Sequence, residues 1–332
     1  MKELMELKKF FMNLVFLAFI GGFIYMGYGG SLETTFDVLL TKISYFAYNA
    51  FSSFDSILFN EEEISDQEAL KLRSASNTLD IDSYSVDAEY YPYYHMLNEN
   101  EKYVYLLLCK NIDKLSPSFN IPVRVSSDEV QNVIEAVYND HPELFWVKNK
   151  YSYKYTQSGD VIQILLEYYF DATTIEKARR EFDVELNKIV EEASTFASDY
   201  EKERYVHNIL LEHIDYVEDS IMNQSAYSAL VNGSSVCAGY SKAFQYILMK
   251  LGIPAYYVTG DADGDHAWNI VKINDEYYNV DITWNDSAHN KYHYFNISDS
   301  IFSISHTRRG LSINLPDCNG YTSSRGNYSI GN

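Results

Sequence analysis

Cysteine is scarce in this chain, and its scarcity excludes one class of small secreted protein. The 332 residues include three cysteines, Cys109, Cys237 and Cys318. Three thiols form at most one disulfide, so the fold is not a scaffold held together by disulfide bonds. Cys109 lies in an apolar run and is interpreted as a small buried hydrophobic residue. Cys318 is either free or paired with Cys109, and the sequence leaves both alternatives open.

Basic residues are also scarce. The chain has 26 Lys and Arg against 47 Asp and Glu, which gives a formal net charge of −21. A protein that binds nucleic acid needs a basic surface for the phosphates, so we expect no nucleic-acid partner. The acidity fits cationic or neutral partners and otherwise keeps a protein soluble. Apolar residues make up 46% of the chain, which indicates a folded protein rather than a disordered one.

The N-terminus combines a short basic tail with a long apolar run. Lys2, Lys8 and Lys9 precede residues 10–28, which contain no charged side chain. As a helix this run spans ~28 Å, close to the thickness of the hydrocarbon core of a membrane. We therefore expect residues 10–28 to anchor the chain as a single membrane span, with residues 1–9 in the cytoplasm and the rest outside. A cleaved signal segment is the alternative, and it would make the protein a secreted one.

Composition and periodicity divide the remainder into three parts. Residues 29–90 combine a juxtamembrane stretch with an acidic linker rich in Glu, Asp and Ser. Residues 91–200 show helical periodicity and two Tyr-rich strands joined by Ser158-Gly159, so we assign them to an α+β N-terminal domain. Residues 201–332 form the last domain, where the chemically informative patterns lie.

Cys237 lies at the predicted start of a helix. Apolar residues recur at helical spacing from Tyr240 to Leu251. Ser234 or Ser235 is a suitable cap for the first turn. The free N–H groups of a first helical turn favour a thiolate and bind an oxyanion. Taken alone, this position fits a nucleophile and a small buried cysteine equally well.

The segment that follows predicts a β-hairpin. The run HAWNIVKI and the run at residues 276–284, EYYNVDITW, are strand-like and are joined by a two-residue Asn-Asp loop. In this register Trp268 faces Asp281 and His266 faces Thr283. His266 and Asp281 are then diagonal neighbours on one sheet face, about 7–8 Å apart at Cα. An imidazole beside a carboxylate is a base with its orienting group, so the hairpin supplies two parts of a nucleophilic triad.

The segments VCAGYSKAF and HAWNIVKINDEYYNVDITWND resemble the transglutaminase-like superfamily, which has a papain-like fold, in its bacterial extracytoplasmic form. The resemblance covers residues 226–286. It implies that Cys237 is the nucleophile, His266 the base and Asp281 the orienting group. It also implies an α+β fold in which the helix that carries the cysteine packs on an antiparallel sheet.

The resemblance extends to residues around the triad. It implies that a residue upstream of the cysteine binds the oxyanion, and Gln224 and Tyr227 are the candidates. Tyr240 belongs to the core or to the cleft wall, and Trp268 packs beside the triad or lines the substrate cleft. The loop at residues 261–265, DADGD, is similar to part of a calcium loop but lacks its length and its terminal Glu. We therefore interpret it as a polar turn and expect neither a metal ion nor a cofactor.

The activity that the resemblance implies is acyl transfer from peptide or protein amides through a cysteine thioester. Water resolves the thioester in a peptidase or deamidase, and an amine resolves it in a transglutaminase. Hydrolysis ranks slightly ahead, with a peptide or protein substrate at the cell surface or in the cell wall. The alternatives are a non-catalytic binding module built on the same core and a purely structural surface protein. The second of these explains the anchor and the acidity but not the triad.

Overall fold

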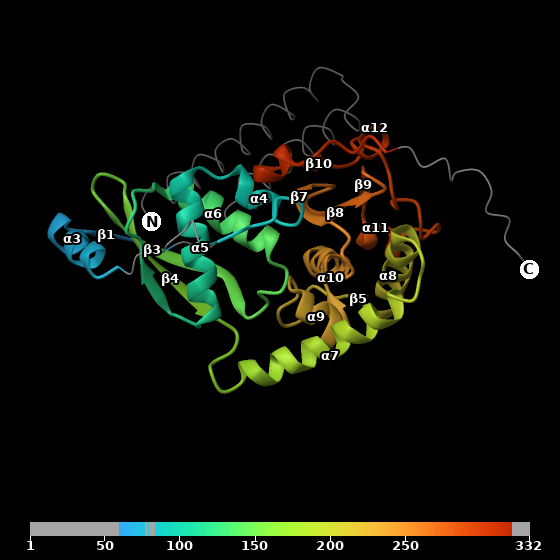
Figure 1. Cartoon of the computed structure of the whole chain (residues 1–332), viewed down its shortest axis with the longest axis horizontal. Helices are drawn as coiled ribbons and strands as arrows, with labels where there is room; N and C mark the ends of the chain where they lie inside the picture. The colour runs from blue at the N-terminus through green and yellow to red at the C-terminus, as the bar shows by residue number, and fades with distance from the viewer. Residues whose placement is uncertain (1–59, 77–78, 80–83, 321–332) are drawn as a thin grey trace, which may run out of the picture. The chain divides into compact units, whose positions relative to one another are not determined.

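The structure is a computed structural model that describes residues 60–76, 79 and 84–320 (Figure 1). All of them belong to one compact unit, Ile57–Asn332. The apolar run at residues 10–28 lies outside the described residues. Among the residues that are described, no helix is long and apolar enough to cross a membrane.

The described chain is a mixture of helices and strands. The helices are α3 Asp66–Ser74, α4 Pro92–Met96, α5 Glu99–Asp113, α6 Ser127–Asp140, α7 Ile175–Ala193, α8 Asp199–His213, α9 Ala226–Val231, α10 Cys237–Lys250, α11 Ile282–Ser287, α12 Asp299–Phe302 and the 3-10 helix η2 Gly310–Asn314. The strands are β1 Asn60–Ile64, β2 Ser118–Asn120, β3 Val147–Thr156, β4 Val161–Tyr168, β5 Asp215–Tyr216, β6 Ser234–Ser235, β7 Ala255–Asp261, β8 Asp265–Ile273, β9 Glu276–Val280 and β10 Thr307–Arg308. The α+β class is therefore confirmed.

The first sheet has the order β1-β3-β4-β2. Its centre is the antiparallel hairpin of β3 and β4, and the predicted Ser158-Gly159 turn uses Gly159 at φ 87°. Helices α5 and α6 begin with capping boxes, in which Asn98 and Ser126 bond the backbone three residues later. The apolar faces of both helices are buried in the core.

Part of the predicted acidic linker is structured. Residues 60–64 form β1, which pairs in parallel with β3, and the Tyr153 hydroxyl donates a hydrogen bond of 2.7 Å to Glu61. Ile64 and Ala69 are buried against Ile162. The linker interpretation is therefore wrong for residues 60–74. The acidic composition instead belongs to an edge strand and a short helix, whose outer side chains are exposed to solvent.

The second sheet has the order β10-β7-β8-β9, and α10 packs against β7 and β8 (Figure 1). The hairpin of β8 and β9 has the predicted register, from Asn269 opposite Val280 to Ile273 opposite Glu276. Asn274 and Asp275 both have positive φ, at 52° and 63°, as a two-residue hairpin turn requires.

Two local predictions near the hairpin and α10 are wrong. The strand ends at Val280 rather than at residue 284, because the Asp281 side chain accepts a hydrogen bond from Trp284 N and starts α11. Thr283 is therefore helical and does not face His266. Ser234 and Ser235 do not cap α10 either, since they form β6 and pair with β5. The N-cap is Val236, which provides no side-chain hydrogen bond.

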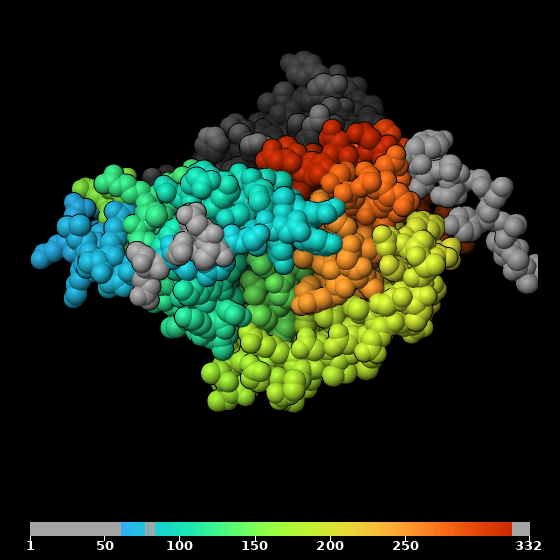
Figure 2. Space-filling view, viewed as in Figure 1, coloured from blue at the N-terminus to red at the C-terminus, as the bar shows by residue number. Residues whose placement is uncertain are grey.

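The segments 91–200 and 201–332 share one hydrophobic core, so the boundary that we placed at residue 200 does not separate two bodies. It falls inside α8. The Tyr93 hydroxyl donates to the backbone oxygen of Tyr257 at 2.6 Å, and Gln245 donates to the backbone oxygen of Asn139 at 2.8 Å. Figure 2 shows the cyan-to-green and orange-to-red parts packed against one another.

Candidate active site

His266 and Asp281 are in direct contact. His266 Nε2 lies 2.8 Å from Asp281 Oδ2, with the histidine on β8 and the aspartate directly after β9. The Asp281 side chain is fully buried, and the His266 side chain is 7% exposed. The second carboxylate oxygen accepts a hydrogen bond of 3.0 Å from Trp284 N, so Asp281 is held both by the imidazole and by the helix that it caps.

Cys237 is the first residue of α10 and lies within hydrogen-bonding reach of His266. Burial lowers the pKa of His266, but hydrogen bonds with Asp281 and Cys237 outweigh it and raise this pKa to about 10. The imidazole therefore carries a positive charge at neutral pH, between the carboxylate and the sulfur. Cys237 is partly exposed and packs beside Tyr257 and Ala267.

A second histidine shares the same carboxylate. His306 Nε2 lies 3.0 Å from Asp281 Oδ2, and its side chain is fully buried. The Ser305 hydroxyl lies 2.8 Å from the other ring nitrogen of His306. Aromatic side chains enclose the ring, with centroid distances of 3.9 Å to Phe302 and 4.5 Å to Trp284.

The sequence patterns did not predict a role for His306. It stands alone in a segment without clear periodicity, 25 positions after Asp281. Residue spacing relates positions within one helix or one hairpin, and neither element includes His306. Only the path of the chain from α12 to β10 brings its side chain to the carboxylate.

His266, Asp281 and His306 also form the cluster of described residues that could hold a metal ion, since their ligand atoms lie within 4.8 Å of one another. Both imidazoles contact the same carboxylate oxygen at 2.8 and 3.0 Å. These are hydrogen-bond distances, so the two imidazoles and the carboxylate bond one another directly.

The loop at residues 261–265 is occupied by an arginine. Arg309 Nη2 lies 2.7 Å from Asp261, and Arg309 Nη1 lies 2.7 Å from Asp265. The guanidinium therefore supplies the positive charge that these carboxylates need, and the loop has the geometry of a salt-bridged polar turn. Asp263, at the tip, has a φ of 58° and is exposed.

Trp268 and Tyr240 are packing residues in the structure. Trp268 is 1% exposed, stacks on the His266 ring at 6.2 Å and donates its indole N–H to Asn279. It therefore packs beside His266, and it also lines an open pocket of about 300 Å³ together with His306. Tyr240 is fully buried, and its hydroxyl lies 2.6 Å from Ile214 O and 3.1 Å from an Asp286 oxygen.

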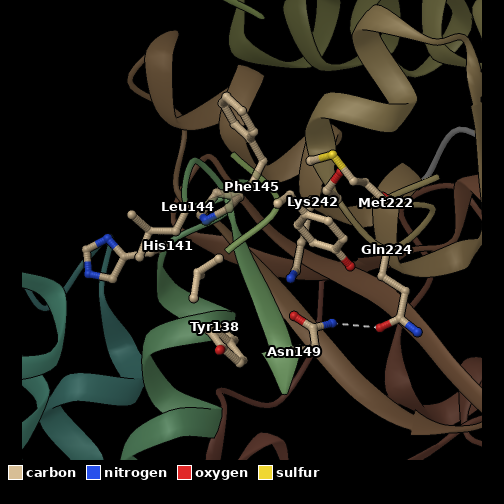
Figure 3. A pocket seen from close by; sticks show the side chains of 12 residues that line it. Tyr138, His141, Leu144, Phe145, Asn149, Met222, Gln224 and Lys242 are labelled. Atoms are coloured by element: carbon tan, nitrogen blue, oxygen red, sulfur yellow. Dashed lines mark hydrogen bonds between the residues drawn. The ribbon is translucent and has the colours of Figure 1, made fainter. Parts of the chain in front are cut away.

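The two upstream oxyanion candidates have different surroundings. The Tyr227 ring stacks on Phe182, and its hydroxyl donates a hydrogen bond of 3.0 Å to Glu181. Tyr227 is therefore a packing residue in this structure. Gln224 lines a small cavity, where its Oε1 accepts a hydrogen bond of 2.7 Å from Asn149 (Figure 3). Neither side chain has a hydrogen bond to Cys237 among the residues that the structure describes.

Comparison with known proteins covers the region that contains this site. The sequence profile of the transglutaminase-like superfamily matches residues 187–282, from α7 to the start of α11. This range includes Cys237, His266 and Asp281. No curated protein matches the chain.

Several solved structures match part of the chain. A transglutaminase (TGase) structure is 17% identical over 50% of this chain and 50% of its own, with a TM-score of 0.28. A protein from Cytophaga hutchinsonii, provisionally named a cysteine protease, is 15% identical over 47% of this chain and 57% of its own, with a TM-score of 0.31. The periplasmic domain of TgpA from Pseudomonas aeruginosa is 14% identical over 38% of this chain and 54% of its own, with a TM-score of 0.27.

The chain spans about half the length of these structures. Their TM-scores are low, so the assignment rests on the profile match and on the sequence motifs within it. Residues 187–282 of this chain belong to the transglutaminase-like superfamily.

Proposed function

We propose that this chain is a cysteine-dependent acyl-transfer enzyme that acts on peptide or protein amides. Cys237 is the nucleophile, His266 the general acid and base, and Asp281 the group that orients and charges the imidazole. One observation carries the proposal: the His266 imidazole lies within hydrogen-bonding reach of both the Asp281 carboxylate and the Cys237 thiol.

The first half-reaction forms a thioester. The Cys237 thiolate attacks the amide carbonyl carbon, and the carbonyl electron pair moves onto oxygen. The backbone N–H groups of Cys237 and Ala238, the first two residues of α10, stabilise this oxyanion, since the N-cap Val236 provides no side-chain hydrogen bond to them and its backbone oxygen accepts from Gly239 N. The C–N bond then breaks, and the leaving amine takes the proton from the His266 imidazolium.

The second half-reaction restores the cysteine. Water or an amine gives its proton to His266 and attacks the thioester carbonyl, and the C–S bond breaks to release the thiolate. Water yields a carboxylic acid and an amine yields a new amide. We place hydrolysis first, as a peptidase, with deamidation or transamidation as the competing outcomes of the same intermediate.

The proposal is tested by the rate at which iodoacetamide alkylates Cys237 between pH 4 and pH 10, measured by mass spectrometry of the Cys237 peptide. A positively charged imidazole next to the sulfur favours the thiolate, so we expect fast alkylation well below the ordinary thiol pKa of about 8.5. His266→Ala removes this charge, and its profile is expected to follow an ordinary thiol.

The matched control is Lys250→Ala, at the exposed end of the same helix, which leaves the profile unchanged. An ordinary thiol profile in the wild-type protein, or the same profile in His266→Ala, contradicts the activated nucleophile. The binding-module alternative is favoured instead if a peptide binds equally well to the wild-type protein and to Cys237→Ala and neither protein turns it over.

A further inference from the structure

Lys242 is a cation near the active site with no acidic partner. It lies on α10, and its ammonium group sits over the rings of Tyr257 and Tyr138, at 5.4 and 5.9 Å from their centroids. Among the described residues, no carboxylate forms an ion pair with it. Burial alone lowers the pKa of Lys242 to about 8, so the side chain remains mostly charged at neutral pH.

Tyr257 connects this cation to the nucleophile. Tyr257 is 7% exposed and packs in one cluster with Ala238, next to Cys237. The ammonium of Lys242 lies over the same ring. The ring of Tyr257 therefore lies next to both the ammonium group of Lys242 and the residues around Cys237. A substrate amide bound at Cys237 is separated from this positive charge by one tyrosine side chain.

A cavity beside Lys242 has room for a small polar group. It has a volume of about 20 Å³, which holds one or two oxygen-sized groups. Figure 3 shows the ammonium of Lys242 pointing toward the space between Tyr138 and Asn149, with Gln224 across from it. Ser225, which precedes α9, completes the polar lining.

The lining has an unusual composition for such an acidic chain. The described residues that form it are Tyr138, His141, Pro142, Leu144, Phe145, Val147, Asn149, Tyr169, Met222, Gln224, Ser225 and Lys242. None of them is Asp or Glu, although the chain contains 47. An ammonium without a counter-ion in such surroundings is costly, and an anion that enters the cavity removes that cost through a charge-assisted hydrogen bond.

We propose that Lys242 binds a carboxylate of the substrate, next to the amide that reacts with Cys237. The cavity volume suits a carboxylate head rather than a ring, and Asn149 and Gln224 provide further amide groups beside it. The carboxylate is either an acidic side chain or a free C-terminus. This inference rests on the proposed function, because it places the acidic group relative to the reacting amide.

The test uses the full-length chain and four versions of one peptide. They carry Glu or Gln beside the reacting residue, each with a free or an amidated C-terminus, and kcat/KM is measured by mass spectrometry. For one of the two carboxylates, we expect the wild-type protein to show a kcat/KM about tenfold higher with the peptide that carries it than with the matching neutral peptide. Lys242→Met is expected to reduce this ratio of kcat/KM values toward one. Lys250→Met, at the exposed end of α10, keeps the wild-type ratio. Comparison of the four peptides shows which carboxylate is bound.

A second measurement does not depend on turnover. N-acetylglutamate is expected to slow the alkylation of Cys237 by neutral iodoacetamide in the wild-type protein more than N-acetylglutamine does, and this difference is lost in Lys242→Met. Equal protection by both compounds in the wild-type protein, or an unchanged charge preference in Lys242→Met, overturns the proposal. Failure of the acyl-transfer function shows separately, as an ordinary thiol profile at Cys237.

Discussion

At the scale of single residues, Asp281 is the point where the sheet, a helix and two histidines meet. It accepts hydrogen bonds from His266 and His306 on one oxygen and from Trp284 N on the other. Burial raises the pKa of Asp281, but the bonds from His266 and His306 outweigh it, and the pKa lies below its ordinary value. The buried carboxylate therefore keeps its charge, which in turn keeps the proton on His266.

His306 is expected to act as a positioning residue through Asp281. His306→Phe keeps an aromatic ring but removes the N–H donor, while His306→Gln keeps a side-chain N–H group. Without this donor Asp281 loses one of the two bonds, from His306 and Trp284 N, that hold it opposite His266, so the imidazolium is less well stabilised and the alkylation profile of Cys237 shifts to higher pH by about one unit in His306→Phe. His306→Gln keeps the donor, so its alkylation profile stays close to that of the wild-type protein.

The measurement is the pH dependence of iodoacetamide alkylation in both variants, with thermal melting to show that each is folded. A purely structural role for His306 changes the melting temperature and leaves the profile in place. A folded His306→Phe protein with the wild-type profile contradicts the positioning role.

The contact between His266 and Asp281 was predictable because both residues belong to one hairpin. A two-residue loop fixes the register, and the register fixes which side chains are neighbours. His306 was not predictable in this way, because it reaches the carboxylate from a separate segment. The surroundings of Gln224 depend on Asn149, which comes from a distant strand.

At the scale of secondary-structure elements, the start of α10 fixes the place of Cys237. The β5–β6 pairing holds Ser234 and Ser235 in place just before the helix. Gly239 then allows the first turn to approach the chain before α9 closely. A Cβ atom at this glycine would lie 2.8 Å from Ser225 O and 3.0 Å from Asn223 O.

Gly239→Ala is therefore expected to move the start of α10. The backbone oxygens in front of it cannot yield as a flexible side chain would, so the free energy of unfolding falls by about 1–3 kcal/mol. The alkylation rate of Cys237 falls as well, because the sulfur loses its place beside His266. Urea unfolding and the alkylation rate are compared with Ala238→Ser, a small change at the preceding residue. If Gly239→Ala is as stable and as reactive as the wild-type protein, the close approach has no role in placing Cys237.

Most elements of the described chain were predictable from local patterns. Helical periodicity in residues 91–200 predicts helices such as α5 and α7, and the Ser158-Gly159 turn predicts the hairpin of β3 and β4. Errors occurred where one local signal competes with another. The run from Asp281 to Trp284 has the apolar character of a strand, but the Asp281 cap makes it helical.

At the scale of the whole molecule, one core joins the region before the family match to the region within it. Tyr93 shows this: its hydroxyl donates to Tyr257 O and lies 2.7 Å from the Ser312 hydroxyl. The C-terminal segment thus packs against both parts, and Leu311 N bonds Glu135 on α6. Composition alone did not reveal this, because a domain boundary depends on contacts between distant residues.

The central claim is that Cys237 forms a thioester with an amide substrate. The most direct measurement is intact-protein mass spectrometry of the full-length chain, quenched in acid during reaction with a mixed peptide and amine library, followed by digestion to locate the adduct. The account predicts an acyl group on Cys237 that hydroxylamine removes and that is absent from Cys237→Ala. A Cys237 that iodoacetamide alkylates rapidly but that never carries an acyl group contradicts it.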